Sequence, residues 1–501
     1  MKAFTTTLLA LLCLSLAASN KPNIVFIMAD DLGLGDISHY WENLESSKAL
    51  VKTPSMDALA EAGMWFTDAH SPTALCSPTR YCVMSGNYNY RSYAPWGVWG
   101  TFRESAIDKG EATLGRVATK AGYSTAFIGK WHLGGDFADK KTGQPYRGND
   151  RGDPNTTVDA SKYIDNGPGA LGFEYSFNIP CGIQGPIYLA YENDVWYPLA
   201  TDSEIIYLDE ASALEPEIVS DKGPGLGDSN WDTREIGKIL SEKAVDFINR
   251  ESVEEPFFLY YCSPMVHVPH MPPASFDGLK IADTTPSPHL DMLKDLDQQV
   301  NRIVKALKAN KVYDNTLIIL SSDNGGLGIS SKTNSAGHDS SGEWRGFKNA
   351  PHEGGHRVPF IAVWDGVIQP GTISDEPVIN MDVLATMAEM MNVEIPKDQA
   401  MDSKSLLPLL TSDQPYESRP YIILQAGSKL QTIYRQDGWK LIMQSDSNCT
   451  KFEPIELYNL DSNPYEEASR NLVDHPEQRA RVKNMHNRYL HIRNSGMRTV
   501  P

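Results

Sequence analysis

Two apolar runs, each followed by a pair of oxygen-bearing side chains, constrain this chain more than any other feature. The run Ile24–Ala29 leads into Asp30-Asp31, and the run Leu317–Leu320 leads to Asp323-Asn324. Short apolar runs of this kind predict buried β-strands. Adjacent carboxylates repel each other unless a cation lies beside them. Two such pairs at two strand ends therefore indicate a shared site for a hard divalent ion with oxygen ligands.

Helical patterns alternate with further strand-like runs along most of the chain. Thr53-Pro54 opens one helical stretch, and Leu290–Leu307 carries the clearest amphipathic pattern. Further buried strands are expected at Ser124–Ile128, Phe257–Tyr261 and Val358–Trp364. This alternation predicts an α/β sheet with helices on both faces, whose active site lies at the carboxyl ends of the strands.

Changes of composition divide the chain into three predicted parts. Residues 1–19 are predicted to be a secretory signal peptide, because Lys2 precedes the apolar run Leu8–Leu16 and the small residues Ala17-Ala18-Ser19. Residues 20–412 form the predicted catalytic α/β domain, in which the Gly- and Pro-rich region 137–235 is interpreted as long surface loops. Residues 413–501 form a smaller predicted α+β domain. Its expected elements are the strands Tyr421–Leu424, Lys440–Met443 and Ile455–Leu460 and a helix over Pro476–Ile492.

The charge and the cysteine count exclude several classes of protein. A formal net charge of -19 argues against nucleic acid or an anionic membrane surface as the main partner. No run after the signal approaches the ~20 apolar residues of a membrane span, so we expect an exported protein, periplasmic or secreted, without a membrane anchor. Cleavage removes Cys13 and leaves an odd five cysteines, too few for a disulfide scaffold. The oligomeric state stays open, as does the pairing of Cys82, Cys181, Cys262 and Cys449.

The most specific motif is Cys76-Ser77-Pro78-Thr79-Arg80. The residue types alone allow a thiolate activated by Arg80, or a loop cysteine bridged to Cys82. The spacing Cys-x-Pro-x-Arg, however, resembles the motif of type I sulfatases, in which the cysteine is oxidised to formylglycine after translation. Because the motif lies between two pairs of oxygen-bearing side chains in an α/β chain, chance is a poor explanation for it.

The resemblance to the type I, formylglycine-dependent sulfatases extends over nearly the whole mature chain, and no core motif position departs from it. The segments that carry it, in chain order, are Pro22–Phe26 with Ala29-Asp30-Asp31, Gly129–Gly134, Pro256–Tyr260 leading to His267-Val268-Pro269, Ser322–Gly325, Trp344–Lys348, Glu353–Pro359, and Glu456–Leu460 with Pro464 and Glu467.

This resemblance implies a fold, a reaction and a role for each residue. The fold is an alkaline-phosphatase-like α/β sandwich with a large mixed central sheet and a smaller C-terminal domain. The reaction is hydrolysis of a sulfate ester, in which a hydroxyl of hydrated formylglycine attacks sulfur. The implied metal ligands are Asp30, Asp31, residue 76, Asp323 and Asn324, and oxygen ligation favours Ca²⁺ first and Mg²⁺ second. A maturase that generates the formylglycine is an implied partner.

The implied catalytic residues are Cys76, Arg80, Lys130, His132, His267 and Lys348. Lys130 and Lys348 hold the sulfate oxygens, and His267 protonates the leaving alcohol. His132 takes a proton from the second hydroxyl of the formylglycine, which Arg80 orients. A residue of any of these types, taken alone, more often has a structural role. The number of these residues and their order along the chain favour a catalytic role. His270, His338 and His352 lie outside the pattern, so a structural role is as expected for them as a substrate contact.

The substrate is predicted only by class. Five aromatic residues after the cysteine motif, Tyr88, Tyr90, Tyr93, Trp96 and Trp99, suit sugar rings, although such clusters more often serve packing. Gly172–Pro180 and Tyr191–Asp194 resemble segments of sulfatases from polysaccharide-degrading bacteria. We therefore expect a sulfated carbohydrate, with carrageenan-like galactans and glycosaminoglycans as candidates. The alternatives are an aryl-sulfate, phosphate or phosphonate monoester hydrolase of the same superfamily, and a non-catalytic glycan-binding relative. The sugar, the sulfated position and endo or exo action stay open.

Overall fold

A computed structural model describes residues 21–45, 47–149, 157–252, 256–328, 331–411, 415–427 and 430–500. The predicted signal peptide, with Cys13, lies outside the described residues. The predicted domain boundary between residues 412 and 413 also falls in a range that is not described, and it stays a prediction.

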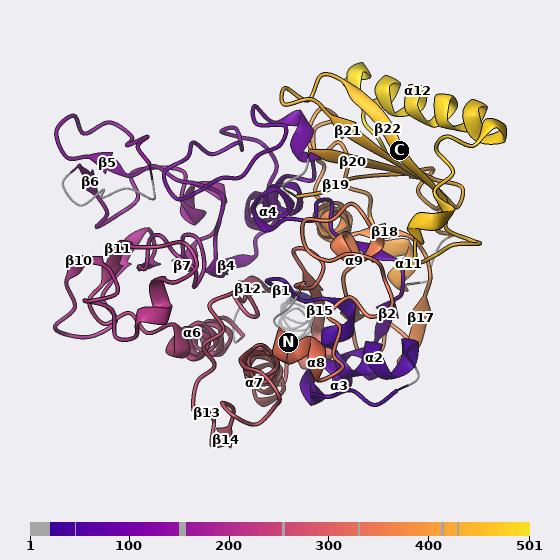
Figure 1. Cartoon of the computed structure of the whole chain (residues 1–501). Helices are drawn as coiled ribbons and strands as arrows, with labels where there is room; N and C mark the ends of the chain where they lie inside the picture. Colours follow the sequence, from indigo (N-terminus) through magenta and orange to yellow (C-terminus); the bar gives the residue numbers. More distant parts are fainter. Residues whose placement is uncertain are drawn as a thin grey trace, which may run out of the picture.

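A ten-stranded mixed sheet forms the centre of the molecule (Figure 1). Its strands lie in the order β17 (Thr372–Ser374), β2 (Met64–Phe66), β16 (Phe360–Val363), β15 (Thr316–Ser322), β1 (Asn23–Ala29), β12 (Phe257–Cys262), β4 (Ser124–Lys130), β7 (Tyr175–Ile179), β8 (Ala190–Glu192) and β9 (Val195–Tyr197). The five strands from β15 to β7 are parallel. Their carboxyl ends therefore meet at one edge of the sheet, and the strands predicted there are confirmed.

Helices of the larger domain pack around this sheet, and the last described helix packs against the C-terminal sheet. The described helices are α2 (Ser38–Leu44), α3 (Pro54–Ala62), α4 (Cys76–Ser85), α5 (Leu114–Lys120), α6 (Ile236–Glu251), α7 (Pro288–Ala309), α8 (Ser331–Ser335), α9 (Glu353–His356), α10 (Val383–Met390), α11 (Leu407–Thr411) and α12 (Arg479–Ser495). Short strand pairs complete the larger domain: β3 (Ala69–His70) with β18 (Val378–Ile379), β5 (Ala138–Asp139) with β6 (Val158–Asp159), β10 (Ile205–Leu208) with β11 (Gly225–Asp228), and β13 (Ser275–Phe276) with β14 (Leu279–Lys280).

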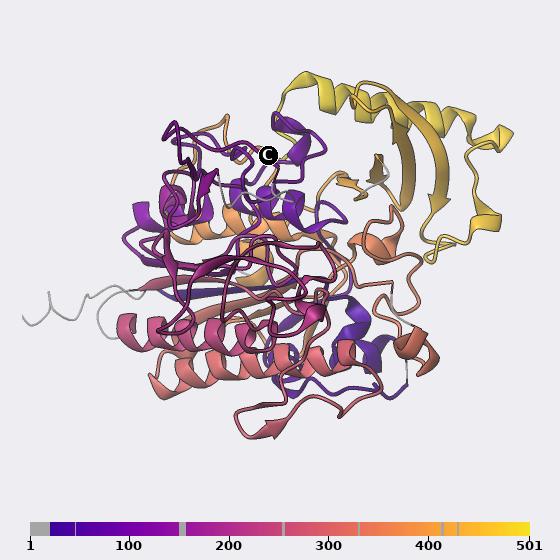
Figure 2. The ribbon, with the colours of Figure 1, turned by 60° about the vertical axis from the view of Figure 1, so that its left-hand side comes forward.

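Both faces of the sheet are buried, which explains the unbroken apolar runs of its strands. Successive side chains of β1 point to opposite faces, so Phe26 joins one core and Ile27 joins the other. The first core is covered by α4, α5 and α10, and the second by α3, α6 and α7. Figure 2 shows α6 and α7 side by side along the lower face of the sheet. The predicted amphipathic helix is confirmed as α7.

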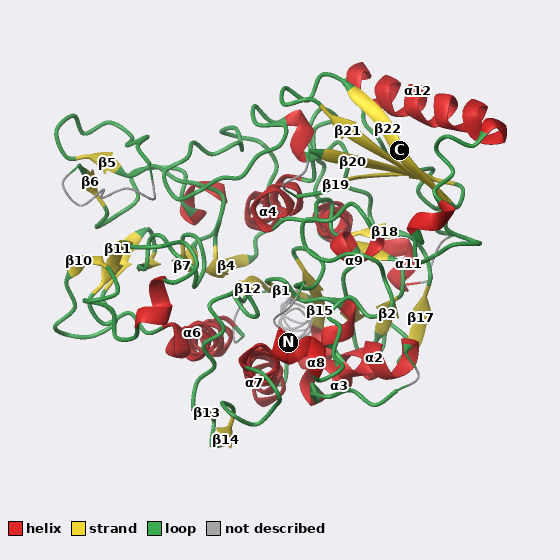
Figure 3. Cartoon of the chain, in the orientation of Figure 1, coloured by secondary structure: helices red, strands yellow, loops and turns green. Residues whose placement is uncertain are grey.

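The interpretation of residues 137–235 as surface loops is wrong in part. Strands β7, β8 and β9 extend the central sheet, and β10 pairs with β11. These strands have only three to five residues each, with Gly, Pro and Asp between them, so no apolar periodicity marks them in the sequence. Irregular segments still make up most of the region (Figure 3).

The C-terminal region contains a four-stranded antiparallel sheet with α12 packed against it. Its strands are β19 (Ile422–Gln425), β20 (Gln431–Gln436), β21 (Trp439–Ser445) and β22 (Phe452–Asn459). Three of these strands and the final helix match the predicted elements, whereas β20 was not predicted. Figure 1 shows α12 on the outer side of this sheet, away from the central one.

A buried network of charges joins the C-terminal sheet to the larger domain. The Nζ atom of Lys440, on β21, lies 2.8 Å from carboxylate oxygens of both Glu353 and Glu466 and 3.0 Å from Nε2 of His356. His70, Glu353 and His356 could by their spacing hold a metal ion. The ammonium group of Lys440 already donates to two of these three side chains, so the cluster is an ion-pair network.

Replacing Lys440 by methionine should destabilise the protein strongly. Lys440 is fully buried, and its loss leaves the buried carboxylate of Glu466 without its cation and that of Glu353 with only its arginine partners. Breaking a buried ion pair in this way costs about 3–5 kcal/mol. We therefore expect Lys440→Met to lower the midpoint of thermal unfolding. Lys451→Met, which removes an exposed lysine of the same domain, is the control and should leave the midpoint unchanged. A Lys440→Met protein as stable as the parent would contradict a stabilising network.

Candidate active site

The carboxyl edge of the parallel strands collects the residues that the sequence predicted to act together. Asp30-Asp31 follow β1, and Asp323-Asn324 follow β15, its partner in the sheet. Lys130 is the last residue of β4, and His267 lies five residues after β12. Gly129 is needed here because a Cβ atom at this position would lie 1.9 Å from the carbonyl oxygen of Cys262 on the neighbouring strand.

Cys76 is the first residue of α4 and not part of a loop, which corrects the sequence interpretation. The described cysteines are all free, so the bridge to Cys82 is also wrong. Burial raises the pKa of the Cys76 thiol, and Lys130 and Lys348 only partly offset this. Arg80 donates instead to the carboxylate of Asp323. This geometry therefore does not support an unmodified Cys76 thiolate that Arg80 activates.

Three buried carboxylates are each paired with a different cation. Lys130 Nζ lies 2.6 Å from Asp30 Oδ2, and Lys348 Nζ lies 2.6 Å from Asp31 Oδ1. Arg80 binds Asp323 Oδ2 through Nη2 at 2.6 Å and Nε at 3.0 Å, and its Nη1 donates to the carbonyl oxygen of Lys130. The three pairs thus tie α4, β4 and the segment around Lys348 to the ends of β1 and β15.

The pKa values of the carboxyl groups differ because their neighbours differ. Burial raises the pKa of Asp30, but Lys130, His267 and Arg80 more than offset it and leave the pKa well below the usual range. For Asp31, Lys348 and His267 outweigh burial in the same way. Burial and the nearby charge of Asp30 raise the pKa of Asp323 to about 7. Asp323 is thus the carboxyl group of the three whose charged form its surroundings favour least.

Two histidines face the same cavity with a free ring nitrogen each. Nδ1 of His267 lies 2.7 Å from the carbonyl oxygen of Val268 and so carries a proton. Nε2 is therefore the atom that can exchange a proton, and it lies 3.7 Å from Asp31 Oδ2. His132 has no hydrogen-bond partner at its buried Nδ1. Burial, together with Lys130 and Arg80, lowers the pKa of His132 well below its ordinary value, which favours the neutral base.

The donor set at this edge fits a hard divalent cation. Asp30 Oδ1 and Asn324 Oδ1 are buried and have no hydrogen-bond partner. Donor atoms of Asp30, Asp323 and residue 76 lie within 4.8 Å of one another. The carboxylates of Asp30, Asp31 and Asp323 balance the charges of Lys130, Lys348 and Arg80, so a divalent ion would leave the site with a surplus of two positive charges. Such a site attracts an anion.

A cavity of about 330 Å³ opens over these residues and contains side chains that the sequence analysis missed. Cys76, His132, His267 and Lys348 line it. The missed residues are Cys181, Gln184, Lys222 and Asn349, which line the same cavity. Asn349 adjoins a motif residue, which could have indicated it. The other three lie in the region interpreted as loops, where no pattern of spacing marked them.

The remaining candidate histidines and most of the aromatic residues have structural partners. His338 Nε2 lies 2.8 Å from Asp36 Oδ1, and His352 Nε2 lies 3.0 Å from Glu456 Oε2. His270 Nε2 bonds to the carbonyl oxygen of Val266. Tyr88 and Trp99 are fully buried in the core. The aromatic cluster therefore serves packing more than the cavity.

Comparison with known proteins shows to which family the chain belongs. The family model described as Sulfatase matches residues 22–393. The chain belongs to the sulfatase family. A second model, described as N-sulphoglucosamine sulphohydrolase, C-terminal, matches residues 342–495 of this sulfatase. The sulfatase is therefore a sulfuric ester hydrolase, and the predicted family is confirmed.

Two curated relatives are similar over nearly the whole chain. An N-acetylgalactosamine-6-O-sulfatase from Bacteroides thetaiotaomicron is 30% identical, over 92% of this chain and 91% of its own length. Arylsulfatase A from Bos taurus is 29% identical, over 95% of this chain and 87% of its own.

Solved structures support the predicted fold. A Bacteroides thetaiotaomicron sulfatase, solved in a study of the metabolism of multiple glycosaminoglycans, has a TM-score of 0.78 and 27% identity. The match covers 95% of this chain and 100% of that one. A protein solved in complex with its substrate, D-glucosamine-2-N,6-O-disulfate, has a TM-score of 0.62 at 18% identity, which shows a common fold. The alkaline-phosphatase-like architecture with a C-terminal domain is confirmed.

Membership of the family implies a formylglycine and a divalent metal ion. The motif that carries the formylglycine matches at Cys76, and the carboxylate edge described above has a donor set that fits the ion.

Removing one carboxylate should remove both the metal and the activity. We expect Asp31→Ala and Asp323→Ala to lose the bound divalent ion and to lower the turnover of sulfate esters by more than about 100-fold, because the ion supplies several kcal/mol of charge stabilisation. Elemental analysis of purified protein and a sulfate-release assay would measure the two effects.

Two further variants make this experiment specific. Asp323→Asn keeps an acceptor for Arg80, so it separates loss of metal from loss of the Arg80 pair. Asp474→Ala removes an exposed carboxylate and should change neither measurement. Oxygen ligands predict calcium first and magnesium second. Stoichiometric zinc in active protein, or metal retained in Asp31→Ala, would contradict the assignment.

Proposed function

We propose that this sulfatase hydrolyses sulfate esters on the sugars of a poly- or oligosaccharide, through a formylglycine formed from Cys76. The observation that carries the proposal is the cavity in which residue 76, two histidines and Lys348 meet beside three buried carboxylates. The name of the N-acetylgalactosamine-6-O-sulfatase relative supports a sugar as the alcohol part of the ester. The same name favours a glycosaminoglycan over a carrageenan-like galactan.

The proposed mechanism assigns one task to each group around the cavity. The formylglycine supplies a hydroxyl nucleophile that an ordinary serine or cysteine could not regenerate. Asp30, Asp31, Asp323, Asn324 and residue 76 would hold a divalent ion, most simply Ca²⁺, which would neutralise charge on the substrate and on residue 76.

The cations and the histidines have the remaining roles in the proposed mechanism. Lys130 and Lys348 bind sulfate oxygens and stabilise the charge that builds up in the transition state. Arg80, fixed on Asp323, orients the side chain of residue 76. His267 donates a proton from Nε2 to the oxygen of the leaving sugar. His132, held neutral by burial, accepts a proton from the side chain at position 76 when sulfate is released.

The environment of His267 agrees with the role of a general acid only when substrate is bound. Burial and the neighbouring charge of Lys348 lower the pKa of His267 to about 4 in the free protein. A bound sulfate ester brings negative charge beside both groups, which opposes these effects and raises the pKa of His267. Because the protonated form is the active one, this contribution is lost as the pH rises through the pKa of the bound state.

The setting of the reaction is part of the proposal. The apolar N-terminal segment and the bacterial N-acetylgalactosamine-6-O-sulfatase among the relatives support export to the periplasm or the medium. Across the described ranges, no helix has the length and apolarity that crossing a membrane requires. A formylglycine-generating maturase is the partner that such a chain needs before it becomes active.

The modification at Cys76 can be tested by mass spectrometry. In a host with a competent maturase, the tryptic peptide Thr53–Arg80 should be roughly 18 Da lighter than encoded, because the thiol becomes an aldehyde. Cleavage after Arg80 places Cys82 on the separate peptide Tyr81–Arg91, which should keep its encoded mass and serves as the internal control. An active enzyme whose Cys76 peptide has the encoded mass would refute the proposed nucleophile.

The two histidines can be separated by the leaving group of the substrate. A nitrophenolate leaves without help, whereas a sugar alkoxide needs a proton. His267→Ala should therefore lower kcat on a sugar sulfate by about 10²–10⁴-fold and affect nitrophenyl sulfate far less. His132→Ala should slow the release of sulfate with both substrates and accumulate sulfated enzyme, because that step no longer contains the leaving group.

Parallel assays on phosphate and phosphonate esters would separate this proposal from its superfamily alternative. Equal losses on both sulfate substrates for His267→Ala would show that His267 binds sulfate, and would shift the acid role to another group. Absence of turnover on every ester by formylglycine-bearing protein would favour a non-catalytic glycan-binding role.

A further inference from the structure

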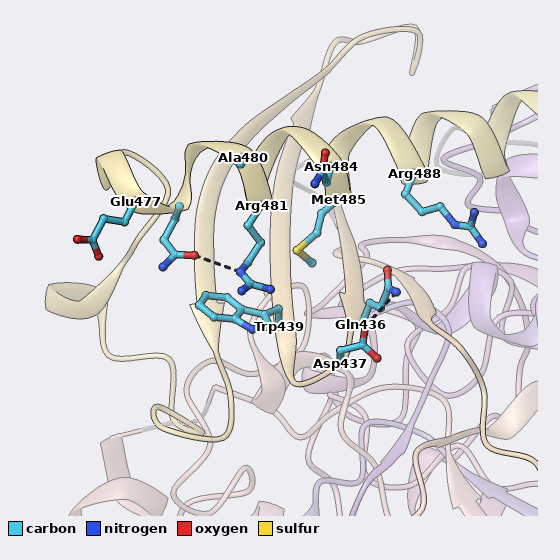
Figure 4. A pocket seen from close by; sticks show the side chains of 10 residues that line it. Gln436, Asp437, Trp439, Glu477, Ala480, Arg481, Asn484, Met485 and Arg488 are labelled. Atoms are coloured by element: carbon cyan, nitrogen blue, oxygen red, sulfur yellow. Dashed lines mark hydrogen bonds between the residues drawn. The ribbon is translucent and has the colours of Figure 1, made fainter.

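A second and larger hollow lies on the C-terminal domain, apart from the residues of the active site. It encloses about 650 Å³ between α12 and the turn that joins β20 to β21. Figure 4 shows Trp439 and Asp437 on the sheet side, with Arg481, Asn484 and Arg488 extending from the helix above them. This groove, defined by those five residues, has no part in the mechanism proposed above.

The helix that forms one wall has an unusual charge for this chain. Helix α12 contains five lysine and arginine residues and no aspartate or glutamate, whereas the whole chain has a net charge of -19. Most of these cations are exposed. A cationic helix on a strongly acidic protein concentrates positive potential at one place on the surface, which attracts anions there.

Three polar side chains that line the groove are spaced along one side of the helix. Arg481, Asn484 and Arg488 follow the i, i+3, i+7 pattern that aligns side chains on one face. A second hollow of about 340 Å³ shares Arg488 and continues past His491 to Arg498. The two hollows therefore follow the length of α12, about 25 Å at 1.5 Å per residue, which suits an extended ligand better than a single small anion.

Arg481 is held ready to bind an anion. Its guanidinium group lies 3.9 Å from the centre of the Trp439 ring, and its Nε donates to Gln478 Oε1 at 3.1 Å. In the described part of the chain its two terminal nitrogens make no hydrogen bond. Stacking fixes the plane of the guanidinium, so little conformational entropy is lost when these nitrogens bind the oxygens of a sulfate group.

The acidic residues of the groove favour one kind of polyanion. Asp437 and Glu477 also line it, so both cations and carboxylates face the space. Carboxylates accept hydrogen bonds from hydroxyl groups but repel a ligand that presents anionic groups alone. A sulfated sugar offers both hydroxyls and sulfates. Nucleic acid and a phospholipid surface present a denser array of phosphates.

We propose that the groove between α12 and the β20–β21 turn binds a sulfated polysaccharide at a site separate from the active site. The choice of a sulfated sugar rests in part on the function proposed above. The groove holds one stretch of a polymer while sulfate esters elsewhere on it reach the cavity over residue 76. The groove therefore increases the affinity for polymers and has no effect on the turnover of a sulfated monosaccharide.

The test uses the full mature enzyme and two matched pairs of substitutions. The groove pair Arg481→Gln/Arg488→Gln removes two cations that line the hollow. The control pair Arg479→Gln/Lys483→Gln removes two cations of the same helix that do not line it. Affinity electrophoresis in chondroitin sulfate should show a Kd about tenfold or more higher for the groove pair and less than about threefold higher for the control pair. Polygalacturonate, which has one carboxylate and no sulfate per sugar, should retard the parent far less.

Kinetic measurements separate this proposal from the proposed function. The groove pair should have a higher KM for the polymer and an unchanged kcat/KM for a sulfated monosaccharide. Should the groove pair fail to fold, chondroitin sulfate should still protect Arg481 of the parent from phenylglyoxal. Three results would contradict polysaccharide binding in the groove. They are an equal loss of affinity for chondroitin sulfate in both pairs, equal retardation of the parent by polygalacturonate, and tighter binding of the parent to phosphatidylglycerol vesicles. Absent turnover of every sulfated monosaccharide would instead overturn the proposed function, and the binding result would still stand.

Discussion

The pairing of three buried carboxylates with three buried cations is the constraint on which the active site depends. An isolated charge in this environment would cost several kcal/mol, so each carboxylate at the ends of β1 and β15 needs its own partner. Those partners come from three other places: Arg80 from α4, Lys130 from β4, and Lys348 from the segment before α9. The same pairs that neutralise the carboxylates thus fix the positions of these cations, of which Lys348 lines the cavity together with residue 76.

Local backbone strain accompanies this arrangement. Asp31 and His132 both adopt positive φ angles, of 63° and 53°, which cost non-glycine residues about 1–3 kcal/mol each. Hydrogen bonds hold both residues in place: the amide of Asp31 donates to Asp323 Oδ1, and that of His132 donates to the carbonyl oxygen of Pro180. The turn at Asp31 directs its carboxylate toward Lys348 instead of continuing β1. The strain is therefore part of how a strand end becomes a binding site.

The sequence was sufficient for features that are encoded locally and insufficient for those that depend on long-range contacts. Apolar runs such as Ile24–Ala29 and the stripe of α7 predicted the central sheet and its covering helices, and the motif at Cys76 indicated the family. Strands β7 to β9 have too few residues to show a period, so their place in the sheet was missed. No motif marks Lys440 or Gln184 in the sequence. Only the folded chain shows that Lys440 pairs with Glu353 and that Gln184 lines the cavity.

The C-terminal sheet contributes to the active site through the segment that contains Lys348. Arg345, three residues before it, donates to the hydroxyl of Tyr458 and to the carbonyl oxygen of Glu466. After it, the amide of Glu353 donates to the carboxylate of Glu466. Between these anchors, the amide of Lys348 bonds to the carbonyl oxygen of Gly326, next to the carboxylate edge. The segment is thus held by the C-terminal domain on one side and by the carboxylate edge on the other. The C-terminal family model likewise begins at residue 342, before the predicted boundary at 413, and so includes the segment that contains Lys348.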